Sequence, residues 1–293
     1  MENLRIERRS VGVNFNGRGQ AQVMLWAPAL EQVSICVNGS GTYPLIREEY
    51  GYWVLETDRL RPGDTYQFIA GGELRPDPAS LSQPDGVHGP SRALDLQAFH
   101  WTDDTWNNTD LENYIIYELH TGTFSAPGTF RGIEEKLDHL RELGVTAIEI
   151  MPVAQFPGSR NWGYDGVFPF AVQESYGGAA QFQHLVNLCH QKGLAVILDV
   201  VYNHFGPEGN YLETYGPYLT ARYATPWGKA VNFDDAWCDG VRHFFVENVL
   251  MWFRDFHVDA LRLDAVHAIR DFSPVHILTE IRSRVDQLMQ LTG

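Results

Sequence analysis

The first part of the chain alternates apolar and polar residues, as half-buried strands do. The alternating runs are Ala21 to Trp26, Gln32 to Val37, Tyr52 to Leu55 and Thr65 to Ile69. Gly, Asn and Pro punctuate the sequence between these runs. Short strands separated by turn residues at this spacing are typical of a small β-sandwich. We therefore expect an all-β sandwich of the carbohydrate-binding kind over residues 1–98.

After residue 114 the pattern changes, because short apolar runs now alternate with longer segments of helical spacing. Strands are predicted at 114–119, 147–151, 195–201 and 260–264, and helices at 133–143, around 182–189, at 241–256 and at 273–291. Strands that alternate with helices predict right-handed crossovers and a parallel sheet. About four such units are half of a (β/α)8 (TIM) barrel. The predicted fold is thus an N-terminal sandwich followed by the first half of such a barrel.

The limits of these parts can be predicted from the same pattern. We expect a linker at 99–113 and the partial barrel at 114–293, with a long loop at 202–240. Ser273 is a suitable N-cap for the last helix, with Pro274 in its first turn.

Composition narrows the kinds of partner that fit this chain. It carries 22 basic and 37 acidic residues, a net charge of -15. Nucleic-acid binding needs a basic surface, so the charge argues against it. The chain also holds 16 Phe, 13 Tyr and 8 Trp. A neutral, polyhydroxylated ligand agrees with both the acidity and the abundance of aromatic rings.

Cysteine usage and hydropathy indicate the compartment. The 3 Cys residues are widely spaced, which favours neither a disulfide framework nor a zinc site. The stretch from Met1 to Ser10 is charged and lacks the apolar core of a secretory signal. No apolar run approaches the roughly 18 residues of a membrane span. We expect a cytoplasmic protein with no membrane partner, no metal and no cofactor, since no nucleotide or metal motif is present.

Charged residues follow two predicted strands where each should emerge from the sheet. Asp199 closes the third strand and is followed by His204, while Arg262 and Asp264 close the fourth. Two positions separate Arg262 from Asp264, so their side chains should point the same way. A neighbouring guanidinium lowers the pKa of a carboxylate and orients it, as a nucleophile requires. The structural alternative is an Arg–Asp pair that only lines the strand ends.

Aromatic residues in the predicted loops could contact a sugar. Tyr164, in the segment Asn161 to Asp165, can present its ring, and Asp165 could support an Arg. The loop from Phe205 to Asp235 is rich in Tyr and Trp, most of which should pack within the loop. His120, at the end of the first predicted strand, is a candidate for the site or for a position behind it.

Several motifs, in order along the chain, resemble those of a known family. Asp199-Val-Val-Tyr-Asn-His204 and Arg262-Leu-Asp264 are similar to the first two signature regions of the α-amylase superfamily of glycoside hydrolases. The pattern most resembles the maltooligosyltrehalose trehalohydrolase family. Further similar segments are Tyr117 to Phe124, Asn161 to Gly166, Asn203 to Tyr211 and Thr225 to Gly228. The likeness runs from about Val11 to the end of the chain.

The resemblance implies a retaining hydrolase with an α-glucan substrate. It would cleave the α-1,4-glucosidic bond next to the trehalose end of maltooligosyltrehalose and release trehalose. Asp264 would be the nucleophile, held by Arg262. The substrate-binding positions implied are Tyr164, Asp199, His204, Leu263, Ala265, Val266 and His267. A Lys then His, common in amylases, is His267 then Ala268 here, so an amylase-type Lys contact does not carry over.

The family's general-acid Glu follows a fifth strand and is absent from these 293 residues. Glu280 is no substitute, because it falls within the last predicted helix. We therefore expect weak or no hydrolysis by this chain alone. An open parallel edge could also support self-association. Three alternatives stay open: a glycogen debranching or branching relative, a non-catalytic glucan-binding protein, and a fragment without function.

Overall fold

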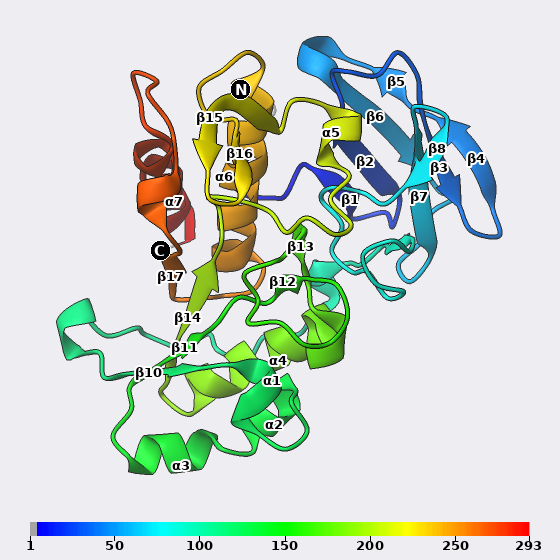
Figure 1. Ribbon diagram of the computed structural model, residues 1–293. Helices are drawn as coiled ribbons and strands as arrows, with labels where there is room; N and C mark the ends of the chain where they lie inside the picture. The colour runs from blue at the N-terminus through cyan, green and yellow to red at the C-terminus, as the bar shows by residue number, and fades with distance from the viewer. Residues whose placement is uncertain (1–4, 293) are drawn as a thin grey trace.

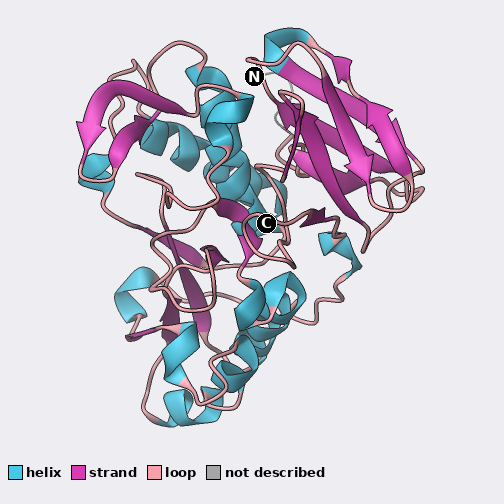
Figure 2. Ribbon diagram, turned by 45° about the vertical axis from the view of Figure 1, so that its right-hand side comes forward, coloured by secondary structure: helices cyan, strands magenta, loops and turns pink. Residues whose placement is uncertain are grey.

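Two antiparallel sheets form the N-terminal part of the molecule in the computed structural model, which describes residues 5–292 (Figures 1 and 2). The first sheet has the strand order β1-β2-β6-β5 and the second β4-β3-β7-β8, with β9 paired to β7. Their bounds are β1 Gly12–Phe15, β2 Ala21–Trp26, β3 Val33–Val37, β4 Gly41–Pro44, β5 Ile46–Arg47, β6 Tyr52–Thr57, β7 Thr65–Ala70, β8 Glu73–Arg75 and β9 Ser91–Arg92.

Alternation explains why these residues form sheets with a shared interior. In β3, Val33, Ile35 and Val37 are buried while the residues between them are partly exposed. The inward residues of both sheets belong to one apolar core. The strands predicted from alternation are confirmed within a residue or two at their ends.

A four-stranded parallel sheet follows, with the strand order β10-β11-β14-β17. Its strands are β10 Ile116–Leu119, β11 Ala147–Ile150, β14 Ala195–Val200 and β17 Ala260–Leu263. The longer helices are α4 Gly178–Gln191, α6 Cys238–Arg254 and α7 Ile277–Thr292. The predicted parallel sheet is confirmed, because each strand pairs in parallel with the next one along the chain. β10 and β17 are its outer strands, and the self-association expected through an open edge stays a prediction.

The helix predicted at 133–143 is wrong as a single element. The structure has α2 Phe130–Glu134 and α3 Leu137–Glu142, preceded by α1 Thr121–Phe124. Between them the amide of Lys136 donates to the carbonyl of Ile133, a tighter turn than the α-helix makes. Ile133, Leu137 and Leu140 are all buried, so two short helices satisfy the apolar spacing that one helix would have satisfied.

The predicted start of the last helix at Ser273 is also wrong, because α7 begins at Ile277. The Ser273 hydroxyl donates to Asp271 and to the carbonyl of Val275 instead of capping a helix. Asp271 takes over the capping role, since its Oδ2 accepts from the amide of Ile277 at 2.5 Å.

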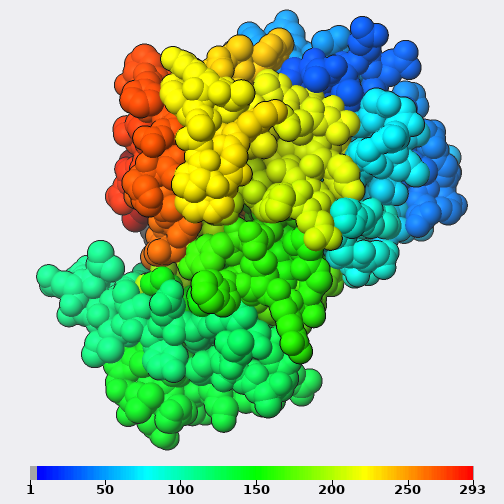
Figure 3. Space-filling view, in the orientation of Figure 1, coloured from blue at the N-terminus to red at the C-terminus, as the bar shows by residue number. Residues whose placement is uncertain are grey.

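Nearly half of the predicted loop at 202–240 forms helix or strand. It contains α5 Leu212–Tyr215 and the hairpin β15 Leu219–Thr225 with β16 Gly228–Val231, and α6 begins inside its limits. A smaller pair, β12 Ala154–Gln155 with β13 Phe168–Val172, precedes it. Figure 3 shows this yellow segment between the orange C-terminal region and the cyan end of the N-terminal region.

Buried polar contacts join the N-terminal sheets to α6. The Ser10 hydroxyl donates to Glu247 Oε1 at 2.6 Å, and the Tyr52 hydroxyl lies 2.5 Å from His243 Nδ1. Trp26 packs so closely on Gly240 that an added Cβ would lie 2.0 Å from the indole. Only glycine fits at this point of α6.

The segment at 99–113, predicted as a linker, contacts α4 and the residue before β17. His190 of α4 lies between two carboxylates, with Nδ1 2.8 Å from Asp103 and Nε2 3.0 Å from Asp259. Trp106 stacks on the imidazole with the ring centroids 4.7 Å apart, and its indole nitrogen donates to Asp259. Since a carboxylate can only accept, both ring nitrogens of His190 must carry protons.

None of the helices that the structure describes has the length and apolar composition needed to cross a bilayer. Residues 1–4 of the charged N-terminal stretch lie outside the described part.

Candidate active site

The candidate site lies where β14 and β17 end side by side. The register pairs Asp199 with Arg262, one residue before each strand finishes. The backbone continues in step, since the amide of Asp264 donates to the carbonyl of Val200 at 2.9 Å. The pairing of adjacent parallel strands therefore brings together residues that are 63 positions apart in sequence.

Arg262 bridges the two carboxylates of the site. Its Nη1 donates to Asp199 Oδ2 at 2.7 Å and to Asp264 Oδ1 at 3.0 Å. The hydrogen bond to Asp199 is the largest cause that raises the pKa of the Arg262 guanidinium above its already high ordinary value. The arginine thus stays charged and orients both acids at once.

Asp199 is the buried member of the pair, with a side chain that is 0% exposed. Burial raises its pKa to about 6, although the hydrogen bonds from Arg262 and Tyr164 act in the opposite direction. The Tyr164 hydroxyl donates to the same Oδ2 at 2.9 Å. Burial next to this carboxylate raises the pKa of Tyr164 well above its ordinary value, so the phenol remains a donor.

Asp264 is the accessible acid, with 18% of its side chain exposed. Its Oδ1 is held by Arg262, whereas its Oδ2 accepts no hydrogen bond from residues 5–292. A carboxylate with one oxygen fixed and the other open to solvent can attack an electrophilic carbon.

His204 lies behind this group with only 5% exposed. Burial lowers the pKa of its imidazole, and Asn203 Oδ1 lies 2.9 Å from Nδ1. The indole of Trp227, from the turn of the β15–β16 hairpin, stacks on the imidazole at 4.5 Å and 9°. His204 is therefore a neutral, rigidly held ring at the site.

Two buried polar atoms here have no hydrogen-bond partner within the described chain. They are Asp199 Oδ1 and Asn203 Nδ2, an acceptor and a donor. Buried polar atoms normally find partners, so an acceptor and a donor are left unsatisfied within the described part of the site.

Gly163 lets the preceding loop approach the site closely. Its φ is +100°, and an added Cβ would lie 2.1 Å from the carbonyl oxygen of Pro152. No other residue fits there, and the next residue, Tyr164, consequently reaches Asp199. Asp165 accepts from Asn161 at 2.7 Å, and the expectation that it supports an arginine stays a prediction.

The remaining predicted substrate contacts follow Asp264 or precede it by one position. Ala265 adopts a left-handed conformation with φ +40°, Val266 is 45% exposed and His267 is exposed. Leu263 is half-buried and packs against the core. His120 contacts the loop that carries Tyr164, with Nε2 2.8 Å from the carbonyl of Asn161 and 3.0 Å from the Tyr176 hydroxyl.

Sequence reasoning missed two features around this site. Trp227 was one aromatic residue among several in its loop, and nothing local marks it as the ring that covers His204. Glu118 and Glu149 stand opposite each other on β10 and β11, and burial beside Glu118 raises the pKa of Glu149. Both predicted strands carry a Glu at the corresponding position, so this pair could have been recognised from the sequence. Within residues 5–292, no three His, Cys, Asp or Glu side chains are grouped to hold a metal ion.

Comparison with known proteins gives a consistent result. Residues 90–224 match the α-amylase catalytic domain model. A malto-oligosyltrehalose trehalohydrolase of Saccharolobus solfataricus is 53% identical over 271 residues, which cover 92% of this chain and 47% of that protein. A 1,4-alpha-glucan branching enzyme of Pseudoalteromonas atlantica is 30% identical over 76% of this chain and 34% of its own length.

Among solved structures, a putative alpha amylase from Salmonella typhimurium superposes with a TM-score of 0.91 at 39% identity. The match covers 96% of this chain and 48% of the other. The chain thus spans about half the length of the relatives it matches.

Proposed function

Because this chain belongs to the maltooligosyltrehalose trehalohydrolases of the α-amylase superfamily, we propose that its complete gene product releases trehalose from maltooligosyltrehalose. The bond cleaved is the α-1,4-glucosidic bond next to the trehalose end, and the configuration at the anomeric carbon is retained. The observation that carries this proposal is the bridge from Arg262 to Asp199 and Asp264.

In this proposal Asp264 attacks the anomeric carbon. A bond forms between that carbon and a carboxylate oxygen, the glucosidic C–O bond breaks, and the departing oxygen takes a proton from a general acid. Water then hydrolyses the glycosyl-enzyme. Arg262 keeps Asp264 aimed during the attack, which is supported by the 3.0 Å bond to Oδ1.

Asp199, His204 and Tyr164 form the binding surface around the reacting glucose. A neutral His204 carries one N–H, which donates to Asn203 Oδ1, so its Nε2 can only accept. Leu263, Ala265, Val266 and His267 complete the contact along the strand end and the turn that follows it.

We infer that the four strand–helix units are the first half of an eight-stranded barrel, and that the two N-terminal sheets form a sandwich in front of it. Retention needs a second carboxyl about 5–5.5 Å from the nucleophile. Glu280 does not supply it, because its carboxylate is bound by Arg242 at 2.7 Å. We place the acid outside these 293 residues. A cytoplasmic location completes the proposal and agrees with three unpaired cysteines.

The test is the Asp264→Asn variant of the complete gene product. Loss of trehalose release with an unchanged fold is the expected result, because an amide cannot form the glycosyl ester. Asp138→Asn, which removes a surface carboxylate paired with Lys192, is the matched control and should retain full turnover. Trehalose release by the Asp264→Asn variant at the rate of the control would refute the proposed role.

The products distinguish the alternatives. New α-1,6 links or debranched maltodextrins would indicate a branching or debranching enzyme. The similarity to the branching enzyme is the observation that favours this alternative. Glucan affinity without turnover would indicate a binding protein.

A further inference from the structure

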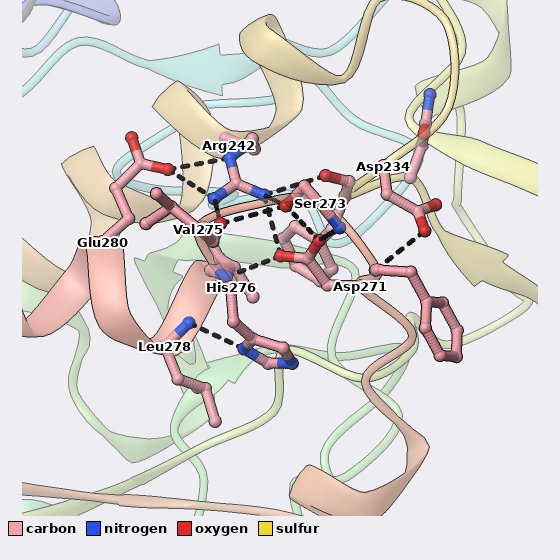
Figure 4. Close-up of polar contacts among 12 residues, drawn as sticks. Asp234, Arg242, Asp271, Ser273, Val275, His276, Leu278 and Glu280 are labelled. Carbon is pink, nitrogen blue, oxygen red and sulfur yellow. Dashed lines mark hydrogen bonds and ion pairs between the residues drawn. The ribbon is translucent and has the colours of Figure 1, made fainter.

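One buried guanidinium, that of Arg242, ties the loop after Asp264 to two other parts of the protein (Figure 4). Arg242 lies on α6 and its side chain is 9% exposed. It donates to the carbonyl of Phe233 at 2.9 Å, Asp271 Oδ2 at 2.8 Å, Ser273 Oγ at 3.1 Å, the carbonyl of Val275 at 2.6 Å and Glu280 Oε2 at 2.7 Å. These acceptors belong to the end of the hairpin, to the loop and to α7.

The loop has little regular structure with which to hold its own shape. Between the short 3-10 turn Val266–Ala268 and the start of α7, residues 270–276 form neither helix nor strand. Asp271, whose side chain is 0% exposed, accepts from the amides of Ser273 and Ile277. The loop is therefore shaped by side chains, and Arg242 is the cation at their centre.

A second contact fastens the same loop to the β15–β16 hairpin. Asp234 Oδ2 accepts from the amide of Phe272 at 2.9 Å and from the Tyr223 hydroxyl at 2.7 Å. The rings of Tyr223 and Phe272 lie 5.7 Å apart. Because the turn of this hairpin carries Trp227, which covers His204, the loop and the hairpin wall the site as one unit.

The loop begins at the candidate nucleophile. Ala265 turns the chain in a left-handed conformation, and the amide of Ala268 returns to its carbonyl at 2.8 Å. From there to α7, the backbone is held by the buried Ala268 and Ile269 and by the contacts to Arg242, Asp271 and Asp234. The stretch from Ala265 to His267 is joined to the loop through this buried pair.

We propose that Arg242 is a positioning residue, which holds the 270–276 loop so that the Ala265–His267 stretch beside Asp264 keeps the arrangement that receives the glucan. This inference rests on the proposed function. Arginine is required because its planar fork offers five donors and reaches several acceptors at once, whereas lysine offers three donors from one point. Arg242 touches neither Asp264 nor the expected position of the substrate, so it acts through the loop.

The experiment compares Arg242→Met with Arg254→Met in the complete gene product. Arg254 is the matched control, because it lies on the same helix with 8% of its side chain exposed, and it binds Asp255 and the carbonyl of Ile6. A loosened loop is correctly placed only part of the time. The substrate must then select that fraction, so KM should rise about tenfold while kcat stays within about threefold.

Partial unfolding would do the opposite, lowering the apparent kcat without changing KM. Arg254→Met should at most lower the apparent kcat and should leave KM unchanged. An unchanged KM in Arg242→Met, or an equal rise in both variants, would overturn the proposal.

Hydrogen exchange on the 293-residue chain gives a second readout that needs no turnover. Arg242→Met should speed exchange in the peptides that cover 265–277 but not in β10 or β11. If Arg242→Met does not fold, Arg242→Lys and Glu280→Gln remove part of the same set of bonds and should speed exchange in the same peptides. Unchanged exchange there would refute the proposal. Absence of trehalose release by the wild type would instead refute the proposed function and leave exchange to decide the role of Arg242.

Discussion

Replacement of Asp199 by Asn should remove a pH dependence of stability that the wild type must show. The carboxylate is fully buried, and its pKa rises from an ordinary 3.8 to about 6. The folded protein therefore binds this proton more tightly than the unfolded chain does. Stability from this group is fully present below pH 3.8 and is lost as the pH rises through 6.

The magnitude follows from the two pKa values. Each unit corresponds to about 1.36 kcal/mol, so the ionised Asp199 costs the folded state about 3 kcal/mol at pH 8. At pH 5 the group is mostly protonated in the folded protein and ionised in the unfolded chain, and the cost falls to about 2 kcal/mol. The wild type should thus gain about 1 kcal/mol from this group between pH 8 and pH 5.

The assay is urea unfolding of the 293-residue chain at pH 8 and pH 5, for the wild type, Asp199→Asn and Asp165→Asn. Titration of all other groups cancels when the pH change of a variant is subtracted from that of the wild type. Asp199→Asn should lack the gain of about 1 kcal/mol. Asp165→Asn, which removes an exposed carboxylate of the neighbouring loop, should keep it. If Asp199→Asn followed the wild type at both pH values, burial would not control the ionisation of Asp199.

Two further predictions concern stability. His190→Gln should destabilise the chain by about 3 kcal/mol below pH 6.5, because it removes the cation between Asp103 and Asp259 and leaves only Asp103 with an imidazole partner, His257. Since the carboxylates raise the pKa of His190, this loss should shrink as the pH rises through the raised value. An equal loss in urea unfolding at pH 6 and pH 9 would contradict the assignment. Gly163→Ala should cost at least about 1–3 kcal/mol, since the backbone is left-handed there and the new Cβ would meet the Pro152 carbonyl; an unchanged melting temperature in calorimetry would contradict this.

Much of the site could be predicted because its residues stand at the ends of strands. The position of Asp264 two residues after Arg262 is a local fact, and the apolar run before each acid marks where the strand ends. The pairing of Asp199 with Arg262 then follows once the strands are parallel neighbours.

The contacts that the sequence did not reveal join residues far apart in the chain. Trp227 meets His204 only because a hairpin folds back, and Arg242 meets Asp271 only because α6 packs beside the next loop. The start of α7 was misplaced for the same reason. Ser273 and Asp271 are both of residue types that cap helices. Asp271 caps α7 here and is also bound by Arg242, a contact that helix propensity does not predict.

The junction between the N-terminal sheets and α6 has a consequence for exchanging modules among relatives. Trp26 occupies the space that a side chain at Gly240 would need, and Ser10 and Tyr52 complete the hydrogen bonding of Glu247 and His243. A foreign N-terminal module would remove both hydrogen bonds and leave the buried Glu247 and His243 only each other, at 3.6 Å. A working chimera must therefore carry α6 together with the sheets, so the practical seam for recombination does not lie in the stretch that joins the two regions in sequence.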